Sequence, residues 1–150
     1  MKKLLSAAAL GLAAAAFAPA APAYAADPIQ TGAFNNVAVG GYDAVSFFQG
    51  EGVRGSREFS STYLGAEFRF SSAENLALFE ANPSAYAPQY GGYCAWAASQ
   101  GKLAPGSPKH ANIIDGKLYL NFNGSTERRW LRDTATYISL ADDNWPGLLN

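Results

Sequence analysis

The stretch IIDGKLYLNF, residues 113–122, decides the fold more clearly than any other part of the chain. β-Branched and aromatic residues flank the pair Asp115-Gly116. An Asp-Gly pair favours the type I′ turn, whose twist matches that of two antiparallel strands. The stretch therefore predicts a β-hairpin.

Working outward, a second hairpin is predicted from residues 58–63 and 66–70 around Leu64-Gly65. In its second strand, Phe68 and Phe70 alternate with charged residues, which is the period of a half-buried strand. A further strand is predicted over residues 42–48, because β-branched and aromatic residues are frequent there.

Helices are predicted between and after these hairpins. Ser71 as N-cap with Glu74 three residues later forms a capping box, and Asn82-Pro83 ends that helix and opens a short new turn. The other predicted segments are a small-residue helix over 93–100 ended by Gly101, a loop over 102–109, and a helix over 126–141 capped by Ser125, with Pro146 barring further helix.

This order of elements predicts an α+β fold, in which helices pack on an antiparallel sheet of about four or five strands. The chain has 150 residues, of which 49% are apolar and 15% charged. That length fits one domain, and that composition excludes an intrinsically disordered chain.

Residues 1–25 are predicted to be a secretory signal peptide. Lys2 and Lys3 precede an apolar segment, and Ala23-Tyr24-Ala25 is a small-x-small cleavage site. We expect a periplasmic or secreted protein with no membrane partner after cleavage. Residues 26–36 are then a loose lead-in, and residues 37–150 form the single domain.

The net charge and the cysteine content exclude some classes of function. A formal net charge of -1 argues against a nucleic-acid partner bound through its phosphates. One cysteine and one histidine exclude an intramolecular disulfide and a closed zinc site built from Cys and His. The sequence also lacks a recognisable catalytic motif, which favours a non-enzymatic protein.

Cys94 is the main candidate functional residue. It follows Gly91-Gly92 and lies in the first turn of a predicted helix, where free N–H groups and the helix dipole stabilise a thiolate. Such a thiolate serves as a metal ligand, a nucleophile or a redox group. The alternative is a small buried hydrophobe, which neighbouring alanines favour.

His110 is the second candidate. If the fold brings it to Cys94, the two form a sulfur and nitrogen ligand set for copper or zinc, or a thiol–imidazole pair. The alternative is a surface histidine beside Lys109. Tyr90, Tyr93 and Trp96 around the two glycines either line a small pocket or belong to the core.

Several motifs occur in an order that resembles the YHS-domain family. The stretch 41–48, GYDAVSFF, is similar to its opening GYDxVxYF, and residues 68–86 are similar to its YxFxS and NPxxY core. The stretches YGGYCA at 90–95, DGKLYLN at 115–121 and NWP at 144–146 resemble an exported bacterial branch that includes selenoproteins. The resemblance implies that Cys94 stands where some relatives carry selenocysteine.

The resemblance also implies metal binding, copper in particular, through paired cysteines. This chain departs from that pattern, because Ala44 stands near the first cysteine position and Phe70-Ser71-Ser72 has no cysteine. Three functions stay open. The first is binding of copper or zinc through Cys94 and His110. The second is thiol redox chemistry at Cys94 with an external thiol partner protein, and the third is a non-enzymatic interaction module with Cys94 buried.

Overall fold

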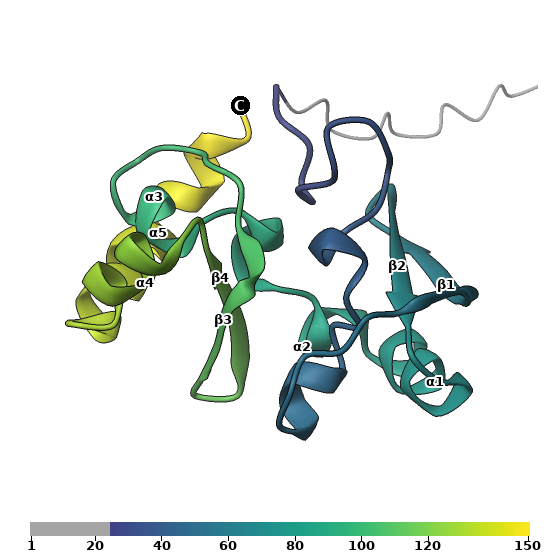
Figure 1. The fold of residues 1–150 in the computed structure, drawn as a ribbon. Coiled ribbons are helices and arrows are strands. Elements are labelled where there is room, and N and C mark those ends of the chain that lie inside the picture. The colour runs from purple at the N-terminus through teal and green to yellow at the C-terminus, as the bar shows by residue number, and fades with distance from the viewer. Residues whose placement is uncertain (1–24) are drawn as a thin grey trace, which may run out of the picture.

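The computed structural model describes residues 25–150, so nearly all of the predicted signal peptide lies outside the described residues. The elements run in the order η1 (Val39–Gly41), η2 (Ser46–Gln49), β1 (Ser56–Tyr63), β2 (Ala66–Phe70), α1 (Ala73–Ala81), α2 (Pro83–Tyr86), η3 (Gln89–Gly92), α3 (Ala95–Ser99), β3 (Ser107–Ile114), β4 (Lys117–Asn121), α4 (Gly124–Trp130) and α5 (Thr134–Leu148). Here η denotes a 3-10 helix. The mixed α+β class is confirmed (Figure 1).

Both predicted hairpins form. β1 pairs with β2 and β3 pairs with β4, each antiparallel. In the β3–β4 turn, Asp115 and Gly116 have φ of 50° and 74°. These two positive values are those of the predicted type I′ turn.

The single sheet of four or five strands is wrong, because the two hairpins are separate two-stranded sheets. The free edge of β2 is taken by an irregular segment, through a bridge between Val37 and Glu67. The free edge of β4 is taken in the same way, through a bridge between Cys94 and Leu120. Short non-strand segments therefore occupy the edges at which β2 and β4 could otherwise have paired with each other.

The strand predicted over residues 42–48 is also wrong. Tyr42 makes only an isolated bridge to Arg54, and the chain then coils into η2. The cause is Asp43, whose carboxylate Oδ1 accepts hydrogen bonds from the N–H groups of Val45 and Ser46 at 2.9 and 3.2 Å. Such local bonding from an aspartate side chain favours a turn over a strand.

The helix after β2 forms as predicted, but its cap is one residue later. Ser72, not Ser71, accepts from the N–H of Asn75 at 3.1 Å. Ser71 is used elsewhere, since its N–H and hydroxyl both donate to Asp43 Oδ2, at 2.9 and 2.7 Å. α1 ends before Asn82, and Pro83 opens α2, as expected.

The predicted helix over 126–141 is two helices. Asn123, rather than Ser125, caps α4, and Asp133 caps α5 by accepting from the N–H of Thr136 at 3.2 Å. Pro146 does not end α5, which continues to Leu148. The side-chain amide of Asn150 donates to the Pro146 carbonyl at 2.8 Å and so completes the final turn.

The predicted loop over 102–109 is shorter than expected, because β3 already starts at Ser107. Pro108 fits there because the β3–β4 register shifts between Ser107 and Ala111, as at a bulge, where proline is tolerated in a sheet. The small-residue helix over 93–100 is reduced to α3, and Cys94 occupies its N-cap position.

Two apolar clusters share β4. Leu118 and Leu120 point to one side, into a cluster with Phe68, Phe70 and Phe79 from the first hairpin and α1. Tyr119 points to the other side, into a cluster built from the C-terminal helices. Figure 1 shows α3, α4 and α5 grouped on the side of the β3–β4 hairpin that lies away from β1 and β2. Successive side chains of β4 thus enter the two clusters in turn, and β4 connects the N-terminal half of the molecule to the C-terminal helices.

The ends of the described chain meet. The N–H of Ala25 donates to the Leu149 carbonyl at 2.7 Å, and Figure 1 shows both ends on the same side of the molecule. The segment predicted as a loose lead-in is also bonded, through the N–H of Gln30 to the Gly91 carbonyl at 2.9 Å. None of the helices within residues 25–150 has the length and apolar character needed to cross a membrane.

Candidate functional site

Cys94 lies between η3 and α3, where the chain passes beside β4. Only 1% of its surface is exposed. Its N–H donates to the Ala104 carbonyl at 2.8 Å, and its carbonyl accepts from Ala98 at 3.0 Å. The backbone at Cys94 is therefore fixed on both sides, and its own amide is not free to stabilise a thiolate.

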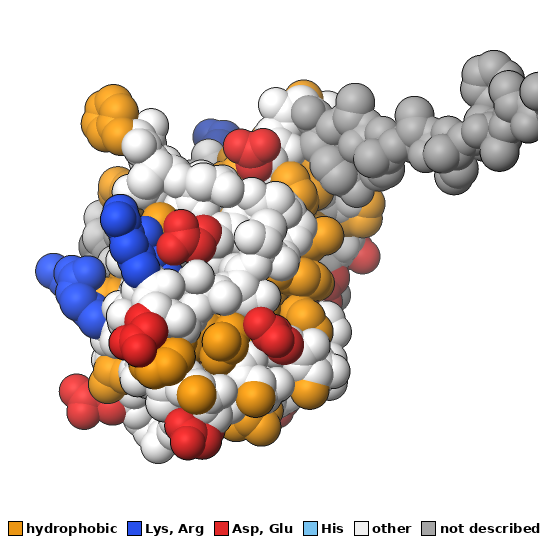
Figure 2. Space-filling model, turned by 90° about the vertical axis from the view of Figure 1, so that its right-hand side faces the viewer, with side chains coloured by type: hydrophobic (Ala, Val, Ile, Leu, Met, Phe, Trp, Pro, Cys, Tyr) orange, Lys and Arg blue, Asp and Glu red, His pale blue; other side chains and the backbone are white. Residues whose placement is uncertain are grey.

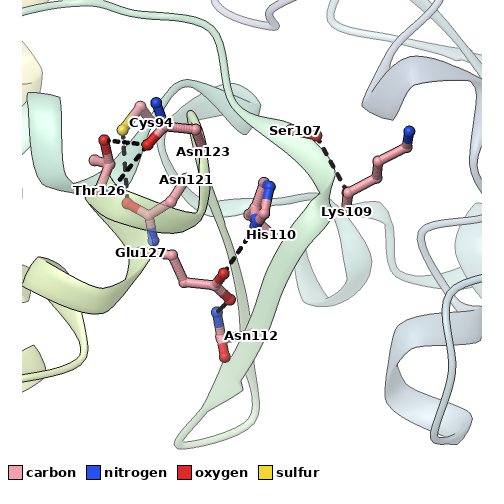
Figure 3. Close-up of polar contacts among 9 residues, drawn as sticks. All are labelled: Cys94, Ser107, Lys109, His110, Asn112, Asn121, Asn123, Thr126 and Glu127. Carbon is pink, nitrogen blue, oxygen red and sulfur yellow. Dashed lines mark hydrogen bonds and ion pairs between the residues drawn. The ribbon is translucent and has the colours of Figure 1, made fainter.

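The sulfur of Cys94 faces the side chain of Asn121 (Figure 3). The thiol donates to Asn121 Oδ1 at 3.5 Å, and the N–H of Trp96 donates to the same oxygen at 3.1 Å. Because the Trp96 N–H needs an acceptor, it determines which end of the Asn121 amide faces the sulfur. A carbonyl oxygen in that place accepts from the S–H, so this geometry suits a neutral, packed thiol.

Two buried donors lack a partner within the described part of the chain. They are Nδ2 of Asn121, whose oxygen faces the thiol, and Nε1 of Trp130 in the C-terminal cluster. Both residues are fully buried. Unsatisfied buried donors are costly, so Asn121 makes the surroundings of Cys94 a polar spot in the core.

His110 has a different partner from Cys94. Its Nδ1 lies 2.8 Å from Glu127 Oε2, and Asn112 Nδ2 donates to Glu127 Oε1 at 2.8 Å. Figure 3 shows that the His110 ring turns toward Glu127, while the Cys94 sulfur turns toward Asn121. The pair links β3 to α4, and it leaves Nε2 of His110 as the ring nitrogen that faces away from the carboxylate.

Cys94 and His110, the residues expected to form a copper or zinc site, have different side-chain partners in the structure. The thiol and the imidazole are each hydrogen-bonded to a different side chain. Within residues 25–150, no three side chains of His, Cys, Asp or Glu are grouped so that they could hold a metal ion.

The aromatic cluster around Gly91-Gly92 is partly core and partly groove. Tyr90 is 6% exposed, and its hydroxyl donates to Asp142 Oδ1 at 2.8 Å. Burial first, and then this hydrogen bond, raise the pKa of Tyr90 far above its usual range. Gly91 is required here, because its φ is 62° and a Cβ would lie 1.9 Å from the Pro28 carbonyl oxygen.

A groove of about 360 Å³ opens beside this cluster. It runs between the N-terminal segment, the β1–β2 turn and the end of α5, and its lining includes Pro28, Tyr63, Leu64, Pro88, Tyr90 and Trp145. Cys94 does not line it. The groove and the thiol are thus separate features of the molecule.

The sequence did not single out Asn121 or Glu127, which are the partners of the two candidate residues. Asn121 ends β4 and Glu127 lies in the first turn of α4. Glu127 does follow the Asn123 cap at the usual place of a first-turn acid, but nothing in that pattern connects it to a histidine in β3. The pairing depends on how α4 packs against the hairpin.

Comparison with known proteins adds no relative. The chain matches no family model, no curated protein and no solved structure.

Proposed function

We propose that this protein is an exported, YHS-like interaction module that acts by binding and not by catalysis, with Cys94 as a packed part of its scaffold. The observation that carries the proposal is the environment of Cys94. Its side chain is 1% exposed and its thiol bonds to a carbonyl oxygen that the Trp96 N–H holds in place.

Thiol redox chemistry fits this environment poorly. Exchange with an external thiol needs a thiolate that another sulfur can approach. At Cys94 the approach is closed, and only one cysteine is present, so the chain itself has no resolving thiol. The redox hypothesis therefore requires α3 and its surroundings to open.

Metal binding is the second candidate, and one observation favours it. Glu127 bonds to Nδ1 of His110 and orients the ring, as carboxylates do for histidines that bind a metal through the other nitrogen. The side chain of His110 is 29% exposed, so the ring is within reach of an ion from solvent. A ligand set that also includes Cys94 requires a rearrangement of the Asn121 side chain.

The deciding experiment follows the alkylation of Cys94 in the folded protein. We expect labelling to be slower by about 100-fold or more than in denaturant, because the thiol reacts only when the surrounding structure opens. A matched control places a thiol on the surface in the double variant Cys94→Ala, Ser125→Cys. Ser125 is exposed at the start of α4, so this thiol should react at the unfolded rate.

Metal content measured on the same purified protein separates the alternatives. The proposal expects no copper or zinc that is retained by the protein and lost in Cys94→Ala. Rapid labelling of the folded protein contradicts a packed thiol and favours redox chemistry. Stoichiometric metal that disappears in both Cys94→Ala and His110→Ala favours the metal hypothesis instead.

A further inference from the structure

A second pocket, of about 280 Å³, lies in the N-terminal half, away from Cys94 and from the aromatic groove. It is lined by Gly32, Asn35, Val37, Gly40, Gly41, Arg54, Gly55 and Arg69. Half of these residues are glycines and two carry a guanidinium group. The pocket therefore exposes backbone and positive charge, with little apolar side-chain surface.

Backbone pairing holds the walls of this arginine pocket in place. The N–H of Gly55 donates to the Gly41 carbonyl at 2.9 Å, and Tyr42 bridges to Arg54. On the opposite wall, the N–H of Ala38 donates to the Glu67 carbonyl at 2.9 Å. The cavity is thus built from segments tied to one another, as in a preformed binding site.

The backbone of the arginine pocket has two unusual features, a left-handed stretch and a position that admits only glycine. Val39, Gly40 and Gly41 follow one another with φ of 53°, 59° and 80°, and Val39 is a buried β-branched residue. Left-handed backbone is rare for such a residue. Gly55 admits no side chain, because a Cβ would lie 2.4 Å from the carbonyl carbon of Arg69. Strained, close-packed backbone of this kind is concentrated at binding sites.

Contacts with neighbouring side chains hold both guanidinium groups in place. Arg54 lies over the ring of Tyr42, with its Cζ 5.1 Å from the ring centroid. Arg69 uses Nε to donate to Glu67 Oε1 at 2.7 Å, which leaves its two terminal nitrogens free of that bond. This hydrogen bond lowers the pKa of Glu67, so the pair stays ionised at neutral pH.

We propose that the arginine pocket binds a phosphate group. Guanidinium groups match the geometry of phosphate oxygens and donate charge-assisted hydrogen bonds to them. The glycine walls let the phosphate approach the backbone closely. The inference rests on the proposed function only in that the protein acts by binding, since the pocket is remote from Cys94.

The phosphate has two possible sources, a free phosphate compound or a lipid headgroup, and one residue separates them. Phe34 lies between the pocket residues Gly32 and Asn35, and its side chain is fully exposed, with a relative accessibility of 102%. On the face in Figure 2, Lys and Arg side chains gather to one side, with Asp and Glu side chains beside them. An exposed aromatic ring beside a phosphate site inserts into the boundary between headgroups and acyl chains when the phosphate belongs to a membrane surface, and so adds affinity there.

The test is a titration of the protein with sodium phosphate, followed by amide NMR and matched by sodium chloride at equal ionic strength. We expect saturable shifts at Gly40, Gly41 and Gly55 with phosphate only. Arg54→Ala and Arg69→Ala should each weaken binding by about tenfold, as expected for loss of a charged donor. Arg132→Ala is the matched control, because Arg132 is an exposed arginine between α4 and α5, outside the pocket, and should leave the affinity unchanged.

Vesicles with and without an anionic phospholipid then identify the source. A lipid headgroup predicts binding to the anionic vesicles that Phe34→Ser weakens, while Phe34→Ser leaves the titration with inorganic phosphate unchanged. A free compound predicts phosphate binding without vesicle binding. The proposal is overturned if neither phosphate nor vesicles bind, or if Arg132→Ala weakens binding as much as Arg54→Ala. Reactivity of Cys94 is measured separately, so failure here leaves the proposed function standing.

Discussion

Asp43 organises the N-terminal half through five hydrogen bonds to its buried carboxylate. Oδ1 accepts from the N–H groups of Val45 and Ser46, and Oδ2 accepts from Ser71 twice and from Asn75 Nδ2 at 2.7 Å. Asp43→Ala leaves all of these donors without a partner in the protein interior. We expect the free energy of unfolding, measured with urea, to fall by about 3 to 5 kcal/mol.

Two further variants test the origin of that loss. Asp43→Asn keeps one oxygen but turns an N–H₂ group toward donors, so its loss should lie between those of the wild type and Asp43→Ala. Asp143→Ala removes an exposed carboxylate from α5 and should change the unfolding free energy by less than about 0.5 kcal/mol. A small effect of Asp43→Ala, similar to that of Asp143→Ala, contradicts this view of the N-terminal half.

Asp43 also explains why the sequence misled at this point. Residues 42–48 are rich in β-branched and aromatic residues, and this composition predicts a strand although the segment contains an aspartate. Ser71 does not cap α1 as predicted, because its N–H and hydroxyl donate to the carboxylate of Asp43. The first error has a local cause, because Asp43 accepts from N–H groups two and three residues further along the chain. The second comes from a bond between residues 28 positions apart, which no local pattern contains. The side-chain partners of Cys94 and His110 are also distant in the sequence, because they belong to β4 and α4.

At the scale of elements, the start of α4 offers a direct comparison of two candidate caps. Asn123 Oδ1 accepts from the N–H and the hydroxyl of Thr126, both at 2.9 Å, while the exposed Ser125 lies within the helix. Asn123→Ala should therefore lower the unfolding free energy by about 1 kcal/mol, the usual value of an N-cap. Ser125→Ala should change it by less than about 0.5 kcal/mol. The reverse order in urea denaturation places the cap at Ser125 and contradicts the observed helix start.

The elements that the sequence predicted well are those whose reasons are local. An Asp-Gly turn, alternation in β2 and proline at the start of α2 all act within a few residues. How hairpins combine is not local. The edges of β2 and β4 are taken by Val37 and Cys94, residues that have no strand pattern around them. A count of strands could therefore not predict the sheets.

At the scale of the whole molecule, tyrosines tie the C-terminal helices to the rest. Tyr90 comes from η3, packs 5.9 Å from the ring of Tyr119 in β4 and bonds to Asp142 in α5. Burial, followed by the charge of Asp142, also raises the pKa of Tyr119. Both phenols thus keep their protons in the folded protein at a pH where free tyrosine, with a pKa of about 10, ionises.

This difference predicts how stability depends on alkaline pH. The raised pKa values belong to the folded state, so the unfolded chain loses its tyrosine protons at a lower pH than the folded chain does. The contribution of these tyrosines to the free energy of unfolding is therefore complete below about pH 10 and is lost as the pH rises above it. The slope is at most about 1.4 kcal/mol per pH unit for each such tyrosine. Urea unfolding at a series of pH values, with phenolate absorbance as a second readout, should show a fall that is shallower in Tyr90→Phe. Tyr42→Phe is the control, because Tyr42 packs on Phe47 in the N-terminal half and not at this junction, and it should reproduce the wild-type slope. Equal slopes in wild type and Tyr90→Phe contradict a buried, Asp142-bonded phenol at the junction of η3, β4 and α5.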